Sequence, residues 1–225
     1  MLRGRARLPV LAEVSGPPEG ARVWSLRRQD FAALEQILPR LDGGRVVLVG
    51  GDGEATLIAA IALAATNSAR GRRTVIVECN LAQPRLAAEV GVTATPGLHE
   101  YLRWEAEAAD VLRPVALAGP ATAAAAEPLV CICGGRPAVD GEVLLGLQSF
   151  AHMVEKLRAA YELVVAIAPP VLGEPAACLA AAAQADAAVA GLVAAEIKGR
   201  AGRATRHAIR RLPVPALGAV VVHAQ

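Results

Sequence analysis

The feature that most constrains the fold is the stretch from residue 45 to residue 64, RVVLVGGDGEATLIAAIALA. An apolar run, Val46 to Val49, reaches a glycine cluster, and an alanine-rich, helix-prone segment follows without an intervening loop. The order of buried strand, glycine turn and helix is how α/β proteins direct a helix N-terminus toward an anion, usually a phosphate. We therefore expect a strand, a tight turn and a helix here.

The turn departs from a working phosphate-binding loop, G-x-x-x-x-G-K-[ST], whose lysine contacts the outer phosphates and whose hydroxyl contacts Mg²⁺. Ala55 stands at the last glycine, Thr56 at the lysine and Leu57 at the hydroxyl. A shift of the register by one residue moves Thr56 to the hydroxyl position, which still leaves no cation. The two lysines of the chain, Lys156 and Lys198, are far away in sequence. The loop keeps the frame of a phosphate loop without its positive charge.

Composition narrows the class of protein. The 225 residues suffice for one sizeable α/β domain, and with 54% hydrophobic but 3% aromatic residues its core must consist of Ala, Val and Leu. A net charge of +2, with acids and bases interspersed, gives no reason to expect a nucleic-acid surface. Pro9 and Glu13 interrupt the early apolar stretch, so we expect no signal peptide. The most apolar window, about residues 175 to 195, is too weak for a membrane span. A cytoplasmic protein is expected.

The cysteines and histidines form no metal-binding pattern. They lie at positions without paired C-x-x-C or histidine spacing: Cys79, Cys131, Cys133, Cys178, His99, His152, His207 and His223. We interpret the cysteines as small buried residues in a reducing compartment. Cys131 and Cys133 alternate along a predicted strand, so both should face the same side.

Strands and helices alternate along most of the chain. Strands are expected at about 46–49, 74–77, 129–133, 162–167, 187–194 and 216–222, and helices at about 25–41, 54–69, 85–90, 98–104, 141–160, 175–184 and 200–211. Residues 106–128 fit no single element. This alternation predicts a doubly wound, mostly parallel sheet with helices on both faces, in a single domain spanning residues 25–225 after an N-terminal arm, residues 1–24.

In such sheets, ligands bind at the carboxyl ends of the strands. Here these ends are residues 50–54, 78–80, 134–137 and 168–170. We expect them to converge on one crevice.

The order of motifs resembles the cytoplasmic P-loop domain of bacterial tyrosine autokinases of capsule and exopolysaccharide systems, relatives of the ParA/MinD ATPases. Residues 51–57, GDGEATL, match the family's phosphate loop G-P-G-E-G-K-S, and residues 78–84, ECNLAQP, match D-A-D-L-R-R-P without a gap. Residues 97–102 match G-L-x-x-x-L, and residues 161–172, YELVVAIAPPVL, match Y-D-L-V-I-I-D-T-P-P-V-L. The resemblance implies a P-loop NTPase-like fold. It also implies a degenerate nucleotide site at Gly51, Asp52, Gly53, Glu54, Ala55, Thr56, Leu57, Glu78 and Asn80.

The same comparison argues against activity. The phosphate lysine is replaced by Thr56, the Mg²⁺ hydroxyl by Leu57, the two aspartates of the second motif by Glu78 and Asn80, and the Walker B aspartate by Ile167. Phosphoryl transfer depends on a cation and Mg²⁺ to neutralise charge on the transferred group. The family's tyrosine-rich tail is also missing. We therefore expect no catalytic residue, no metal and no cofactor.

Three functions stay open at this point. The preferred one is a non-catalytic interaction or regulatory component of envelope or exopolysaccharide biosynthesis, which docks to a membrane polysaccharide co-polymerase, to an active homologue or to a second copy of itself. The alternative is a weakly active, Mg-ATP-dependent tyrosine autokinase or ParA/MinD-like ATPase, with Glu78 as a surviving carboxylate and Thr56 as a hydroxyl ligand. In the third, the backbone N–H groups of residues 51–57 hold a less charged ligand.

Several single features also have two interpretations. The glycines at 50, 51 and 53 either bind phosphate or only form a tight turn, and Glu78 is either functional or a solvated or paired carboxylate. The predicted helix 25–41 packs on the core or on a neighbouring subunit. Arginines at helical spacing near the C-terminus either meet an acidic partner or form a solvated helix face: Arg200, Arg203, Arg206, Arg210 and Arg211.

Overall fold

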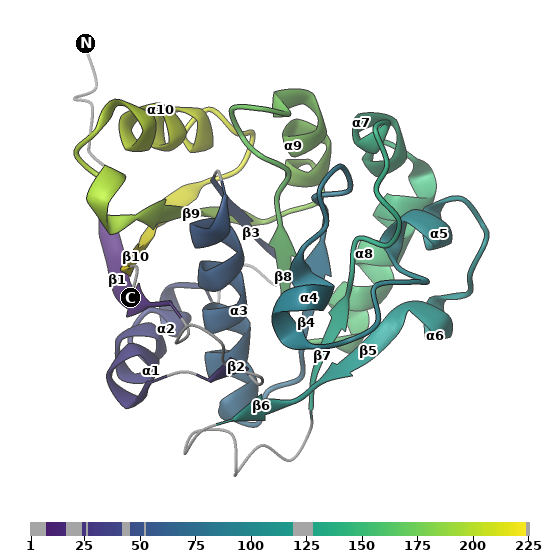
Figure 1. Ribbon diagram of the computed structural model, residues 1–225, viewed down its shortest axis with the longest axis horizontal. Helices are drawn as coiled ribbons and strands as arrows, with labels where there is room; N and C mark the ends of the chain where they lie inside the picture. The colour runs from purple at the N-terminus through teal and green to yellow at the C-terminus, as the bar shows by residue number, and fades with distance from the viewer. Residues whose placement is uncertain are drawn as a thin grey trace.

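An eight-stranded sheet forms the centre of the computed structural model (Figure 1), which describes residues 8–16, 24–25, 27–41, 46–51, 53–118 and 128–223. Asp52 of the predicted site lies outside the described residues. The strand order is β1-β10-β9-β3-β8-β4-β7-β5, and each neighbouring pair is parallel except β5 with β7. The strands are β1 (Val10–Ser15), β3 (Val46–Gly50), β4 (Thr74–Glu78), β5 (Leu112–Val115), β7 (Leu129–Ile132), β8 (Leu163–Ile167), β9 (Ala187–Val193) and β10 (Ala216–His223). A second sheet pairs β2 (Trp24–Ser25) with β6 (Leu117–Ala118).

Helices cover both faces of the main sheet. One face packs against α1 (Arg28–Glu35), α2 (Leu38–Leu41), α3 (Glu54–Ala69) and α4 (Leu86–Val90). The other face packs against α5 (Leu98–Leu102), α6 (Ala108–Val111), α7 (Gly141–Leu145), α8 (Gln148–Ala160), α9 (Pro175–Ala182) and α10 (Arg200–Ile209). A 3₁₀ turn, η1 (Ala194–Glu196), links β9 to α10. Within the described residues, no helix is both long and apolar enough to cross a membrane.

The central strands are apolar throughout because both of their faces are covered. Every residue of β3, β4 and β8 is buried, and alternate residues serve opposite faces: Val47 and Val49 pack with α3, while Val46 and Leu48 pack on the other side. Helix α3 is buried from Ala55 to Ser68. Its many alanines allow this helix to lie close to the strands, so a core with few aromatic residues is still filled.

The predicted fold class is confirmed, with corrections in detail. The helix expected at 25–41 is two short helices, α1 and α2, and the one expected at 141–160 is interrupted between α7 and α8. Residues 106–118, which fitted no element, form α6, β5 and β6. Within the expected arm, β1 pairs in parallel with β10 and forms one edge of the sheet.

Candidate functional site

The carboxyl ends of β3, β4 and β8 converge on one crevice, as the alternating pattern predicted. Its cavity is about 80 Å³. The fourth expected strand end, residues 134–137, reaches this region through the N–H of Gly134, which donates to Glu78. The described residues that line the cavity are Gly51, Gly53, Thr56, Leu57, Glu78, Asn80, Gln83, Arg85, Ile167, Ala168 and Pro170.

Two glycines bring the turn against the sheet. A Cβ atom at Gly51 would lie 2.5 Å from the carbonyl oxygen of Gly191 on β9, and a Cβ at Gly191 would lie 2.7 Å from the Cα of Thr56. Both positions therefore exclude a side chain, because real Cβ atoms do not approach other heavy atoms this closely. Gly53 has a different role: it lies in open space with φ of 78° and starts α3, a conformation that favours glycine. Close packing and chain direction explain these glycines without a phosphate.

The positions of the missing lysine and hydroxyl face the protein interior. Thr56 is buried, and its Oγ1 has no hydrogen-bond partner among the described residues. Leu57 is 4% exposed and belongs to the apolar core between α3 and the sheet, while Ala55 packs beneath the same turn. Glu54, by contrast, is exposed at the start of α3. None of the four side chains supplies a positive charge to the crevice.

Glu78 is a buried carboxylate that joins three segments. It is 2% exposed, and its Oε1 accepts N–H groups of Arg85 at 2.6 Å and Leu86 at 2.9 Å, where α4 begins. Its Oε2 accepts the N–H of Gly134 at 2.8 Å, just after β7. Burial raises the pKa of Glu78, although these N–H groups and the charge of Arg85 act in the opposite direction. Of the two interpretations of Glu78, the paired structural carboxylate fits this geometry.

Negative charge accumulates around the turn. The pKa of Glu89 on α4 is raised, first by burial and then by the nearby charge of Glu54. Arg85 lowers the pKa values of both Glu78 and Glu89, and it is the one cation among the described residues that line the cavity. The charge of Arg85 is therefore balanced by the carboxylates of Glu78 and Glu89 at the place where a phosphate loop needs excess positive charge.

These residues do not fit Mg-ATP, the ligand that the resemblance implies. A cavity of about 80 Å³ is small beside the roughly 300 to 1,000 Å³ typical of small-molecule sites. The oxygen atoms that could bind a metal ion are already hydrogen-bonded or buried. Glu78 accepts three N–H groups, Asn80 Oδ1 accepts the N–H of Gln83 at 3.3 Å, and Thr56 Oγ1 is buried. Among the described residues, the crevice therefore offers little space and few free oxygen ligands for a metal-bound triphosphate.

A second carboxylate network lies beyond β7. Glu100 of α5 accepts the N–H of Gly97 at 2.7 Å and, through Oε1, the N–H and Nε–H of Arg136 at 3.1 and 2.9 Å. Arg136 also pairs with Glu105 and does not belong to the described lining of the crevice. Burial alone would raise the pKa of Glu100, but the donors from Gly97 and Arg136 outweigh burial and hold the pKa below its usual value.

The cysteines are structural, as expected. All four are buried with free thiols, and the Sγ atoms of Cys131 and Cys133 lie 3.8 Å apart on the same face of the sheet. Burial raises the pKa of Cys79, so its thiol stays protonated. Groups of three or more metal-ligating side chains are absent from the described residues.

Sequence reasoning missed the lining residues Gln83 and Arg85, and it missed Gly191, which packs against the turn. Gly191 closes the turn from β9, and the available signal was a lone glycine inside a predicted strand, which indicates a close backbone approach. Arg85 directly follows the second motif, where the resemblance drew attention to residues 78–84 alone.

Comparisons with known proteins give the fold. No protein-family profile matches the sequence, and no curated protein does. The chimerical protein CapA2B2 superposes with a TM-score of 0.78 at 16% identity, over 96% of this chain and 94% of that one. The kinase domain of the Escherichia coli tyrosine kinase ETK gives 0.77 at 14%, over 96% and 91%. MinD from Pyrococcus horikoshii, complexed with Mg-ADP, gives 0.54 at 16%, over 77% and 68%. The chain thus has the P-loop NTPase-like fold of bacterial tyrosine kinase domains and of MinD-like ATPases.

Proposed function

We propose that this protein is a non-catalytic relative of the tyrosine kinase domains, which acts through protein contacts in envelope or exopolysaccharide biosynthesis. Its partner in this proposal is a membrane polysaccharide co-polymerase, an active homologue or a second copy of the chain, and not a nucleic acid. The proposed location is the cytoplasm, at the inner face of the membrane through that partner.

The observation that carries the proposal is the closed crevice. The framework of strand, turn and helix is intact, while Leu57 lies in the core, Thr56 Oγ1 is enclosed and Glu78 is bonded to three backbone N–H groups. Phosphoryl transfer needs cations placed around the transferred group. A crevice whose described lining offers one guanidinium, beside the buried carboxylate of Glu78, supports a role without this chemistry.

Exposed apolar side chains support a role in protein contacts. Six large apolar side chains, together called the apolar patch below, are exposed at or beside α5, α7 and α9: Trp104, Val139, Val143, Leu147, Leu172 and Leu179. Trp104 is 82% exposed and has a φ of 63°, which bulky residues rarely adopt. An ion pair between Arg103 and Asp140 connects the neighbours of Trp104 and Val139. In Figure 1, α7 lies between α9 at the top of the view and α5 at the right. Exposed apolar side chains on neighbouring elements are typical of interaction surfaces.

Calorimetry tests the loss of nucleotide chemistry. Mg-ATP titrated into the purified protein should give no binding heat, and the mixture should release no phosphate. An active tyrosine kinase domain measured in parallel shows that the assay detects binding. Micromolar affinity together with measurable hydrolysis in this chain would favour the weakly active enzyme instead.

Co-purification tests the contact role. The tagged wild-type protein should retain a polysaccharide co-polymerase or an active homologue from membranes of its host. The double variant Trp104→Ala/Val143→Ser should lose it. Glu142→Ala is the matched control, because Glu142 is an exposed neighbour on α7 that does not belong to the apolar patch. Retention of the same partner by the double variant would exclude this surface, and absence of any such partner with the wild type would overturn the proposed role.

A further inference from the structure

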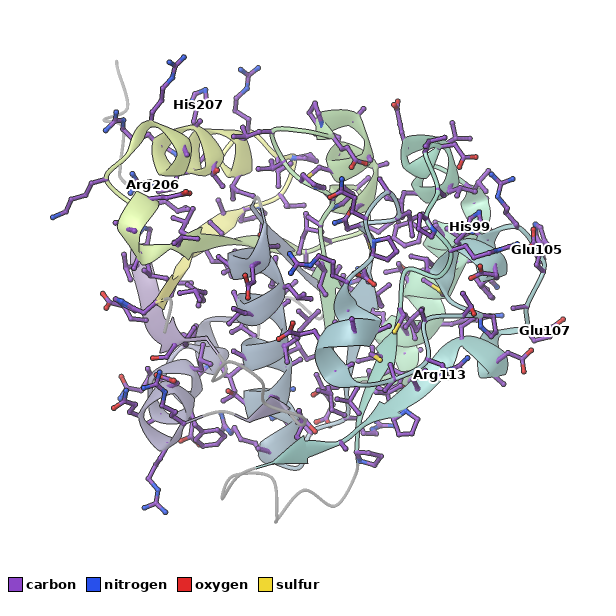
Figure 2. The ribbon with its side chains drawn as sticks, viewed as in Figure 1. His99, Glu105, Glu107, Arg113, Arg206 and His207 are labelled. Carbon is purple, nitrogen blue, oxygen red and sulfur yellow. The ribbon has the colours of Figure 1, made fainter. Side chains whose placement is uncertain are left out.

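A large basic pocket lies away from the crevice, between α10 and the start of β1. Its volume is about 980 Å³, and its described lining is Leu8, Pro9, Val10, Ile197, Lys198, Arg203, Arg206, His207 and Arg210. Four of these side chains carry a permanent or near-permanent positive charge, and none carries a negative one. In Figure 2, Arg206 and His207 lie on α10, on the opposite side of the view from His99 and Glu105.

The charges of this pocket are not neutralised inside the protein. Within the part of the chain that the structure describes, none of the lining cations forms an ion pair with a carboxylate. A concave site concentrates such charges more strongly than a flat surface, because low-dielectric walls focus the field. The pocket therefore attracts anions.

Two of the arginines are held in place by backbone carbonyl groups. Arg206 donates its Nε–H to the oxygen of Gly202 at 3.1 Å and an Nη2–H to the oxygen of Ile197 at 2.7 Å, and it is half-buried. Arg203 donates to the oxygen of Lys198 at 2.6 Å. Each guanidinium has five N–H donors, so most remain available to a ligand. Fixed guanidinium groups lose little freedom on binding and match the geometry of phosphate oxygens.

The arrangement also indicates the shape of the ligand. Arg203, Arg206 and Arg210 recur along one side of α10, and at about 1.5 Å per residue the row is roughly 10 Å long. Leu8, Pro9, Val10 and Ile197 add an apolar wall. The volume lies at the upper end of the range for small-molecule sites, about 300 to 1,000 Å³.

We propose that this pocket binds an organic phosphate with two or more negative charges and an apolar portion. The row of arginines contacts the phosphate groups, and the wall from β1 and Ile197 contacts the remainder. The proposal extends the interpretation of Arg203, Arg206 and Arg210 as residues that meet an acidic partner, while Arg200 and Arg211, outside the lining, fit a solvated helix face. The proposal is independent of the proposed function, since the two sites share no described lining residue.

Isothermal titration with inorganic diphosphate, in metal-free buffer of low ionic strength, tests the site. The wild type should bind, and the double variant Arg203→Gln/Arg210→Gln should bind about tenfold or more weakly, because charge-assisted hydrogen bonds are lost. Arg200→Gln/Arg211→Gln is the matched control. It removes the same charge from the same helix at exposed positions outside the pocket lining, so its affinity should stay within about twofold to threefold of the wild type.

Two further experiments identify the site at which diphosphate binds and the kind of compound that supplies the phosphate group. Arg85→Gln, which removes the cation of the crevice, should leave diphosphate binding unchanged. Vesicles of phosphatidylcholine with phosphatidylglycerol, compared with phosphatidylcholine alone, show whether the phosphate is offered by a lipid headgroup or by a soluble compound. Binding to neither diphosphate nor anionic vesicles overturns the proposal. Equal losses in the two double variants, or a loss confined to Arg85→Gln, overturn it as well.

Discussion

The crevice at the strand ends and the basic pocket beside α10 differ in nearly every property that matters for an anion. The crevice is about 80 Å³, with one arginine and one carboxylate, that of Glu78, among its described lining residues. The basic pocket is about 980 Å³ and contains three arginines and a lysine. In the crevice, the carboxylate of Glu78 is used for hydrogen bonds within the protein, since it accepts backbone N–H groups. In the pocket, the guanidinium groups keep most of their donors free.

The difference shows that a fold can keep the outline of a binding site after its chemistry has become structural. Gly51 and Glu78 occupy the places where the resemblance puts phosphate and metal contacts. In this chain, the first allows α3 to lie against β9, and the second joins β4 to α4 and β7. Four predictions test whether the crevice is a structural element in this sense.

The largest effect on the free energy of unfolding is expected where the turn contacts β9, at Gly51 and Gly191. Gly51→Ala and Gly191→Ala each place a methyl group against backbone atoms 2.5 to 2.7 Å away, so each should lower the free energy of unfolding by about 3 kcal/mol or more in urea titrations. Gly173→Ala is the control, because its nearest neighbour, Pro170, is at 3.5 Å and leaves room. Unchanged stability of Gly51→Ala would mean that this glycine is present for a ligand instead.

Glu78→Gln should be the next most damaging change. Glutamine has one acceptor oxygen, so its amide group must face the N–H of Gly134 or the pair from Arg85 and Leu86 without accepting from them. We expect a loss of about 2 kcal/mol in the free energy of unfolding at neutral pH. Chemical denaturation measures it, and a loss below the experimental error would show that the three contacts are dispensable.

The two buried carboxylates should respond to pH in opposite directions. The pKa of Glu78 is raised in the folded state, so its contribution to stability is complete below the unfolded pKa and is lost as pH rises through the folded pKa. The advantage of the wild type over Glu78→Gln should therefore grow as pH falls. The pKa of Glu100 is lowered, so its contribution is present above the unfolded pKa and is lost as pH falls through the folded one. The advantage over Glu100→Gln should therefore shrink on the same titration. Parallel curves for the two variants would contradict the assigned environments.

The smallest effect is expected for the exposed cation of the crevice. Arg85→Gln removes a charge that lowers the pKa values of Glu78 and Glu89, so both should rise, which NMR titration of the carboxyl groups detects. The free energy of unfolding should change by less than about 1 kcal/mol, because the side chain is exposed. Substitution of Arg200, an exposed residue at the start of α10, is a suitable comparison for a change of charge elsewhere.

Much of the fold follows from the sequence, because continuous apolar runs such as Val46 to Val49 identify strands buried on both faces. The edge strand β5 was harder to predict from the sequence. β5 contains Pro114 and pairs antiparallel with β7, and such a short edge strand has no period that distinguishes it from a loop. The break between α7 and α8 at Gly146 is invisible to a helical pattern that continues on both sides.

For the site, the sequence predicted which residues meet but not what they do there. The convergence of Gly51, Thr56 and Glu78 follows from topology alone. The enclosure of Thr56 depends on Gly191, which is 135 residues later in the chain. The role of Glu78 depends on backbone N–H groups, whose positions cannot be predicted from the residue types. Long-range contacts of this kind become visible in three dimensions only.

Gly50, the last residue of β3, lies under Ile209 of α10: a Cβ at this glycine would be 2.5 Å from the Cδ1 of the isoleucine. The helix that bears the arginine row is thus fixed directly above the strand that leads into the turn. A bulkier residue at position 50 would displace the end of the Ile209 side chain, so we expect the two positions to change together among homologues. Such covariation would tie the evolutionary history of the basic pocket to that of the closed crevice.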